Sequence, residues 1–405
     1  MNPPFLRRIT IRNYKSIAFA QLELRSLMFL VGPNGAGKSN FLDALRFIAD
    51  SLRTSIDHAL RDRGTIKEVR RRSGGHPNHF ALRVDFSLPD GSVGHYSFRV
   101  GAKPSGGFEV QQEECAVASG IAPECSHHYL VRAGQVVSAS VSHLPAGLPD
   151  RLLLVAASGL PEFRPVFDAL SRIEVYNLNP RQIALMQKPD PGESLRRDGD
   201  NAASVLQQLD PDLRQRIGAY LSRIVPGVAS VEPRTLGSQE TVEFRQTVKG
   251  QEHPWRFLAA SMSDGTLRAL GILLAIFQRA AATPDSHAPL LIGLEEPEMA
   301  LHPAAAGVLL AALREASQSV QILVTSHSPD LLDNPDIDAD ALLAVENDAG
   351  LSRIAAIDRA GREMLRDRLF TPGELLRQNQ LAPDLQGGAD IGTDRQIGLF
   401  DFNGS

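Results

Sequence analysis

Hydrophobic and polar residues alternate with a period of two in the first third of the chain. The alternation runs through residues 5–31 and returns in residues 80–145, where a turn signal at residues 89–91 separates two of the runs. A period of two is typical of β-strands that bury one face. We therefore expect strands within residues 5–31 and an antiparallel β-layer over residues 80–145.

The period changes twice after residue 145. Residues 146–227 show helical spacing interrupted by prolines, and residues 228–258 return to strand character. From residue 261 onward, apolar runs of strand length alternate with helical segments, as they do in α/β proteins. The expected elements are helices over residues 266–280 and 303–317, buried strands over residues 290–294 and 320–325, and a closing hairpin over residues 342–357.

A glycine-rich loop separates a short apolar strand, residues 27–31, from a helix with apolar residues three to four positions apart. It fits G-x-x-x-x-G-K-[ST], the phosphate-binding P-loop or Walker A motif. The glycines let backbone N–H groups converge on phosphate oxygens, and the start of the helix adds positive potential. We expect Lys38 to reach the β- and γ-phosphates of a nucleotide and Ser39 to bind Mg²⁺. The motif comprises Gly32, Pro33, Asn34, Gly35, Ala36, Gly37, Lys38 and Ser39.

Two carboxylates follow the apolar strand predicted over residues 290–294. Glu295 stands where an acid could organise Mg²⁺, and Glu296 stands where a base could polarise an attacking water. A solvated pair of surface glutamates is the alternative. The buried character of the strand, and the abrupt stop at Pro297, favour the functional interpretation.

Two further segments carry candidate chemistry. Ser263 and Gly265 stand at the start of the helix predicted from residue 266, where such residues form either an anion site or a plain helix N-cap. His327 follows the strand over residues 320–325, at the edge of the sheet where it could contact a γ-phosphate. A lone histidine is more often structural, but this one follows the acidic pair along the chain.

Along the chain the four motifs are the P-loop, the segment with Ser263 and Gly265, the acidic pair, and His327. In this order they resemble the ABC-type ATPase heads of the SMC, RecF and OLD group, and most of all the AAA_21-like bacterial ATPases of the AAA family. The first strand and turn, residues 9–16, and the P-loop extended to Asn40 are also similar to that group. The resemblance implies an α/β fold: a P-loop NTPase head with a mixed central sheet, an antiparallel β-layer and a helical insertion between Walker A and the signature motif.

The resemblance also implies roles for individual residues. Ser263 and Gly265 would form the signature motif and contact the γ-phosphate of ATP held by a second subunit. Glu295 would hold Mg²⁺ at the Walker B strand, Glu296 would be the catalytic base, and His327 the switch histidine. The cofactors would be ATP and Mg²⁺, bound between two head-to-tail protomers.

Three features depart from the pattern of the group. The signature reads Met-Ser-Asp-Gly-Thr rather than Leu-Ser-Gly-Gly-Gln, and Glu295 stands where aspartate is usual. The glutamate keeps the charge but moves it by one methylene. The third is the Q-loop glutamine, for which the sequence offers several positions: Gln182, Gln187 and positions near residues 73–75.

Combining the patterns with the motifs gives four expected parts. Residues 1–145 form an N-terminal ATPase lobe with the P-loop and the β-layer, and residues 146–227 form a helical insertion. Residues 228–382 form a C-terminal ATPase lobe with the signature, Walker B and the switch histidine. Residues 383–405, rich in Gly, Asp and Gln, form a poorly ordered tail.

Composition narrows the class of protein further. The net charge of −5 excludes a molecule that is basic over its whole surface, although a local basic groove remains compatible with it. Only Cys115 and Cys125 occur, which excludes a disulfide framework. No apolar stretch has the length of a membrane span. We expect a cytoplasmic protein with no membrane partner.

Three functions fit these features. The first is an ATP-hydrolysing dimer that acts as a switch or clamp in DNA repair or anti-phage defence, with DNA as a candidate partner and a separately encoded effector such as a nuclease. The second is a slow or non-hydrolysing nucleotide-gated scaffold, and the third is the ATPase subunit of a transporter. The candidate DNA contacts are Lys67, residues 70–72, Arg196 and Arg197.

Overall fold

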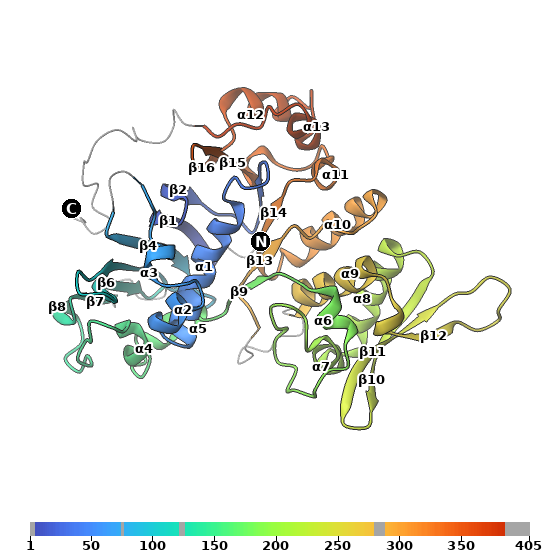
Figure 1. The fold of residues 1–405 in the computed structure, drawn as a ribbon, viewed down its shortest axis with the longest axis horizontal. Coiled ribbons are helices and arrows are strands. Elements are labelled where there is room, and N and C mark those ends of the chain that lie inside the picture. The colour runs from blue at the N-terminus through green and yellow to red at the C-terminus, as the bar shows by residue number, and fades with distance from the viewer. Residues whose placement is uncertain (1–4, 74–76, 121–125, 279–287, 385–405) are drawn as a thin grey trace.

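The computed structural model describes residues 5–73, 77–120, 126–278 and 288–384 (Figure 1). Within these residues one sheet of 13 strands runs across the molecule, and a second sheet has three strands. The large sheet has the order β8 (Gln135–Ala139), β7 (Ser126–Arg132), β6 (Phe108–Ala118), β5 (Val93–Ala102), β4 (His79–Ser87), β1 (Leu6–Tyr14), β2 (Ile17–Glu23), β16 (Leu351–Ala356), β15 (Leu342–Asp348), β3 (Leu27–Val31), β14 (Gln321–Ser326), β13 (Leu291–Glu295) and β9 (Ile173–Tyr176). The small sheet has the order β10 (Val228–Leu236), β11 (Gln239–Gln246) and β12 (Trp255–Leu258).

The large sheet has an antiparallel part and a parallel part. The strands from β8 to β2 in the sheet order pair antiparallel, and so do β16 and β15. The pairs β15–β3, β3–β14, β14–β13 and β13–β9 are parallel. The predicted mixed α/β fold is therefore confirmed. The expected antiparallel layer is not a separate body, because β2 joins it to β16 of the same sheet.

Two hydrophobic cores lie on opposite faces of the parallel strands. Along β3, Met28 and Leu30 belong to one core, and Phe29 and Val31 to the other. Successive side chains of a strand point to opposite faces, so a strand buried on both sides needs a continuous apolar run. Helices pack on both faces of these strands and contribute side chains to both cores. This packing holds the strands in place, and with them the strand ends at the candidate site.

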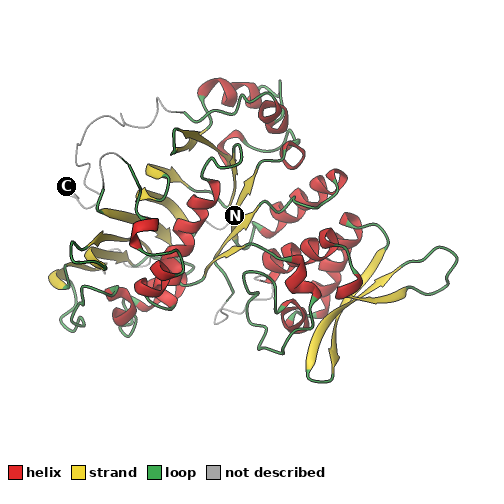
Figure 2. Cartoon of the chain, viewed as in Figure 1, coloured by secondary structure: helices red, strands yellow, loops and turns green. Residues whose placement is uncertain are grey.

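Helices cover both faces (Figure 2). The longest is the 16-residue α1 (Lys38–Arg53), which packs in the first core, whereas α9 (Asp264–Phe277), α10 (Ala306–Ala316) and α8 (Pro211–Ile224) pack in the second. The shorter helices are α2 (Ile56–Arg61), α3 (Ile66–Val69), α4 (Leu153–Ala157), α5 (Arg164–Leu170), α6 (Pro180–Ala184), α7 (Ala202–Gln208), α11 (Pro329–Leu332), α12 (Arg359–Arg366) and α13 (Pro372–Arg377), with 3₁₀ turns η1 (Ala259–Ser261), η3 (Pro303–Ala305) and η4 (Ala339–Ala341).

The structure differs from the sequence-based expectations in several places. Residues 54–73, for which the sequence patterns predict no element, contain α2 and α3, and a hydroxyl side chain caps each helix, Ser55 and Thr65. The stretch expected as a helical insertion contains β9, which pairs with β13 in the large sheet. Of the expected tail, Pro383 and Asp384 pair with the end of β16 and the residue after it, and residues 385–405 lie outside the described residues. Cys115 is buried in β6, and Cys125 lies outside the described residues.

No helix within the described residues is long and apolar enough to cross a membrane.

Candidate nucleotide-binding site

Three neighbouring parallel strands end at the same edge of the large sheet. In the register, Val31 of β3 lies beside Ser326 of β14, and Thr325 of β14 lies beside Glu295 of β13. The P-loop, His327 and Glu296 directly follow these ends. Loops at the carboxyl ends of parallel strands are where open α/β sheets bind ligands. The fold thus brings together three of the motifs predicted from sequence.

Close packing explains two of the P-loop glycines. A Cβ atom on Gly37 would lie 2.0 Å from Ser352 Oγ, and one on Gly32 would lie 2.0 Å from the carbonyl oxygen of Val345. Gly37 also has a φ of 109°, in the left-handed region that side chains disfavour. Pro33, Asn34 and Gly35 are exposed, as is Ser39 at the start of α1.

Lys38 is the unusual member of the loop, because its side chain is only 5% exposed. Its ammonium group donates to the carbonyl oxygens of Gly32, at 2.8 Å, and Pro33, at 3.0 Å. Burial lowers the pKa of Lys38, and the carboxylates of Glu296 and Glu298 act against that shift. A buried cation at the start of a helix, where backbone N–H groups are also free, favours a bound anion.

Asn40, predicted with the P-loop as a nucleotide-binding residue, contacts other residues of the chain in this structure. Its side-chain amide donates to Ser16 Oγ at 2.6 Å, Ser16 Oγ lies 2.6 Å from Ser352 Oγ, and Ser352 Oγ donates to the carbonyl oxygen of Ala36 at 2.6 Å. This chain ties the P-loop to β16 and to the turn between β1 and β2. Asn40 therefore positions the loop in this structure.

Glu296 has a strained backbone with a φ of 44°. Its N–H donates to the carbonyl oxygen of Thr325 at 3.0 Å, which holds the residue against the end of β14. Its carboxylate Oε1 lies 3.1 Å from His327 Nδ1. Strain of this kind in a non-glycine residue is often found at functional sites.

The other carboxylates at this edge are partly desolvated. Burial raises the pKa of Glu295, and Arg197 and Arg46 act against the shift. Burial also raises the pKa of Glu298, whose Oε1 accepts a hydrogen bond from Ser326 Oγ at 2.6 Å. Perturbed carboxylates at strand ends are typical of functional sites.

Three charged residues of this edge were missed as site residues by sequence reasoning. Glu298 follows Pro297 in a loop, so no strand pattern predicts a site role for it. Arg268 of α9 is one charge in an apolar helix, and its pKa is lowered by burial and raised by Glu298 and Glu296. Arg197, predicted as a DNA contact, interacts electrostatically with Glu295.

Ser263 and Gly265 have local structural roles. Ser263 caps α9, because its Oγ accepts a hydrogen bond from the N–H of Thr266 at 3.3 Å and lies 2.8 Å from the Thr266 hydroxyl. A Cβ atom on Gly265 would lie 2.4 Å from the carbonyl oxygen of Ala300, in the loop after β13. The start of α9 therefore packs against the loop that follows the Walker B strand.

The remaining candidates take part in contacts within the chain. Gln187 is buried, and its side-chain oxygen accepts from Ala203 N–H at 2.9 Å, which leaves Gln182 as the more accessible Q-loop candidate. Arg70 donates to the carbonyl oxygen of Pro77 at 2.6 Å, and Arg196 forms an ion pair with Asp190 at 3.0 Å.

The fold and its site agree with a comparison against known protein families. A family described as "AAA domain, putative AbiEii toxin, Type IV TA system" (AAA_21) matches residues 27–115 and 150–333. The chain belongs to the AAA_21 family. The match spans the P-loop, Ser263, the two carboxylates and His327.

Solved structures show the same fold as this AAA_21 protein. The SmcHead bound to the C-winged helix domain of ScpA superposes with a TM-score of 0.55 at 12% identity, covering 88% of this chain and 99% of that one. An Smc head with an extended coiled coil, bound to the C-terminal domain of ScpA from Pyrococcus furiosus, gives a TM-score of 0.50 at 12% identity, with 90% and 99% covered. The predicted resemblance to SMC-type P-loop heads is confirmed.

A local sequence match points the same way. The chromosome partition protein Smc of Desulfitobacterium hafniense (strain Y51) is 52% identical over 48 residues, which are 11% of this chain and 4% of that protein. The chain thus spans a small part of this curated relative.

Proposed function

We propose that this AAA_21 protein binds ATP with Mg²⁺ and hydrolyses it. The observation that carries the proposal is the contact between Glu296 and His327 at the end of two neighbouring parallel strands, beside the buried Lys38. A carboxylate and an imidazole that close together can accept and orient a proton of water.

The residues present fit the two cofactors. Lys38 would contact the phosphates, together with backbone N–H groups of the P-loop. Ser39 and Glu295 would hold Mg²⁺, since hydroxyl and carboxylate oxygens are the ligands that this ion prefers. Bound Mg²⁺ would neutralise charge on the phosphates. Fixed cationic groups there lower the barrier to phosphoryl transfer.

Glu296 is the proposed catalytic base, and His327 the group that orients it. The carboxylate lies 3.1 Å from the imidazole, close enough for the histidine to hold the position of the carboxylate. Arg268 interacts electrostatically with both Glu296 and Glu298.

We further propose a homodimer in which Ser263 and Gly265 of one subunit complete the site of the other. Support comes from the family, from the Smc-like fold and from the position of Ser263 at the N-terminus of the 14-residue α9, where an anion is favoured. The dimer would act as a cytoplasmic switch or clamp in DNA repair or anti-phage defence, coupled to a separate effector. This role rests on analogy with the toxin–antitoxin description of the family and with Smc.

Phosphate release tests the enzymatic part. We expect Mg²⁺-dependent turnover by the wild type and a loss of at least about 100-fold in Glu296→Gln, with ATP affinity retained. Glu363→Gln, at an exposed ion pair with Arg359, is the matched control. If the wild type shows no turnover while partner binding still depends on ATP, the nucleotide-gated scaffold replaces the enzyme.

A further inference from the structure

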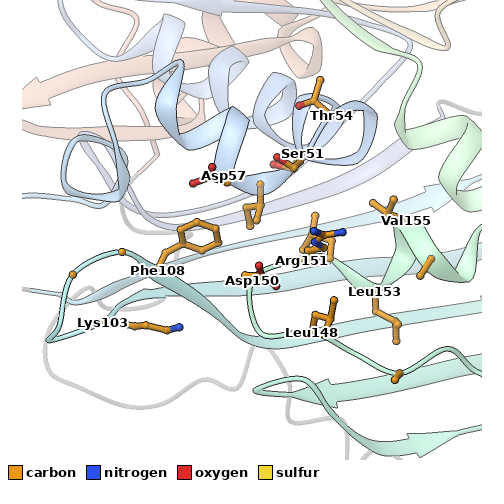
Figure 3. Close-up of a pocket in the computed structure, with 17 residues that line it drawn as sticks. Ser51, Thr54, Asp57, Lys103, Phe108, Leu148, Asp150, Arg151, Leu153 and Val155 are labelled. Atoms are coloured by element: carbon orange, nitrogen blue, oxygen red, sulfur yellow. The ribbon is translucent and has the colours of Figure 1, made fainter.

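A cavity of about 650 Å³ lies far from the candidate nucleotide site, at the other end of α1. It is lined by the end of α1, the start of α2, the turn between β5 and β6, and residues of the 146–156 segment (Figure 3). Because α1 has 16 residues and rises about 1.5 Å per residue, its two ends are about 24 Å apart. The volume lies within the range of small-molecule sites.

The walls of the cavity are largely apolar. Phe108, Leu148, Leu153 and Val155 line it, and Figure 3 shows Leu148 and Leu153 across from the end of α1. Leu148 is 51% exposed and Val155 is 40% exposed, so large hydrophobic side chains stand uncovered at this cavity. A ligand with an apolar body would remove that surface from water.

A buried hydroxyl at the cavity lacks a hydrogen-bond partner among the described residues. Ser51 lines the cavity and is 1% exposed, yet its Oγ makes no hydrogen bond. Two other lining hydroxyls are satisfied: Thr54 donates to the carbonyl oxygen of Asp50, and Ser55 accepts from His58 N–H. Buried polar groups are normally paired, so Ser51 is a group that a ligand would satisfy.

Two cations and two carboxylates line the cavity, and one of the carboxylates already has an ion-pair partner. Lys103 and Arg151 take part in no ion pair among the described residues, and Arg151 lies between the two walls in Figure 3. Asp57 is balanced by an ion pair with Arg61 at 2.9 Å. Asp150 is then the one carboxylate, among the described lining residues, that offsets the two cations.

The floor of the cavity is held rigidly. The carboxylate of Glu113, 1% exposed, accepts hydrogen bonds from the N–H groups of Leu153 and Leu154 and from the hydroxyls of Tyr96 and Tyr129. The two N–H groups fix residues 153–154 to β6, and the two tyrosine hydroxyls, from β5 and β7, hold the carboxylate in place. A preformed cavity costs a ligand less to occupy than one that must be assembled.

We propose that this cavity binds a small amphipathic monoanion, with an apolar body of one or two rings or a short alkyl chain and a single carboxylate. The body packs on Phe108, Leu148 and Leu153, the carboxylate pairs with Arg151, and the Ser51 hydroxyl donates to a ligand oxygen. The site is separate from the nucleotide site and does not depend on the proposed ATPase function.

Titration of 2-naphthoate and of octanoate into the full-length protein tests the proposal. We expect saturable binding of at least one of them with one site per chain, weakened about tenfold by Arg151→Gln and about two- to tenfold by Ser51→Ala. Val155→Trp should block the cavity. Arg164→Gln, an exposed arginine paired with Asp168 outside the cavity, is the matched control and should bind like the wild type.

Three results would overturn it. The first is the absence of saturation by both carboxylates up to about 1 mM. The second is equal binding by the wild type and the Arg151→Gln and Ser51→Ala variants. The third is equal affinity for uncharged 2-naphthol. Binding should persist unchanged in Lys38→Ala, which separates this site from any failure at the P-loop.

Discussion

The edge of the large sheet that carries the P-loop, Glu296 and His327, here called the nucleotide edge, differs from the start of α9. The difference is how far packing and capping within the fold account for the residue types found there. At the start of α9, Ser263 caps the helix and Gly265 avoids the carbonyl oxygen of Ala300, so the fold alone accounts for both. At the nucleotide edge, Lys38 is buried and Glu296 is backbone-strained, features that cost stability. Residues that the fold does not need are the stronger functional evidence.

The largest effect should follow from Lys38→Ala. Removing the ammonium group that would contact the phosphates should weaken ATP binding by at least about 100-fold. Stability should change little, because the lysine is itself a buried charge. Equilibrium binding of a fluorescent ATP analogue measures the effect, with Lys67→Ala on α3 as the control. Unchanged affinity would mean that the loop is only a turn.

His327→Ala should lower kcat by about 100-fold with a smaller change in KM, since the imidazole contacts the proposed base. His327→Gln, which can still hydrogen-bond, should recover part of the loss. Phosphate release at saturating ATP gives the measurement. If kcat stays at the wild-type level, His327 has no part in hydrolysis and is structural.

Substitutions of Ser263 separate its cap from its proposed role at the dimer interface. Ser263→Ala should cost about 1 kcal/mol of unfolding free energy, whereas Ser263→Asp should keep the cap. The negative charge of the aspartate would nevertheless repel the phosphates of the ATP held by the partner subunit. The ATP-dependent dimer should therefore not form. Thermal unfolding and sedimentation test the two properties. A dimer in both variants would leave Ser263 with its structural role alone.

The smallest effect concerns pH. Because burial raises the pKa of Glu295, this carboxylate takes up a proton at a higher pH than an ordinary glutamate as the solution is acidified. Mg²⁺ binds the ionised form, so the Mg²⁺ affinity should be full above the raised pKa and fall as pH drops through it. Glu295→Gln should bind Mg²⁺ more weakly and lose this pH dependence. Titration of Mg²⁺ at several pH values checks it.

The sequence predicts local features of the site well. The P-loop, the two carboxylates and His327 each adjoin an apolar strand run, so pattern and motif together locate them. The neighbouring order of β3, β14 and β13 does not follow from such runs, because it depends on pairing between strands hundreds of residues apart. Strand β9 was not predicted because its pairing with β13 is likewise long-range. Helices α2 and α3 were not predicted because they are short and polar.

The contact between Glu296 and His327, and the electrostatic roles of Arg268 and Arg197, could not be read from the chain. They arise where the ends of β13 and β14 meet α9 and a loop near residue 197, which no local period encodes. A signal was present in Arg268, the single arginine of an apolar helix. A charge kept at such a position indicates a buried partner.

The mass of Glu296→Gln in solution, with and without Mg-ATP, tests the central claim most directly. With hydrolysis blocked and the P-loop intact, the variant should be a monomer alone and a stable dimer with Mg-ATP, and Lys38→Ala should prevent that dimer. A Glu296→Gln protein that stays monomeric at saturating Mg-ATP would contradict the account.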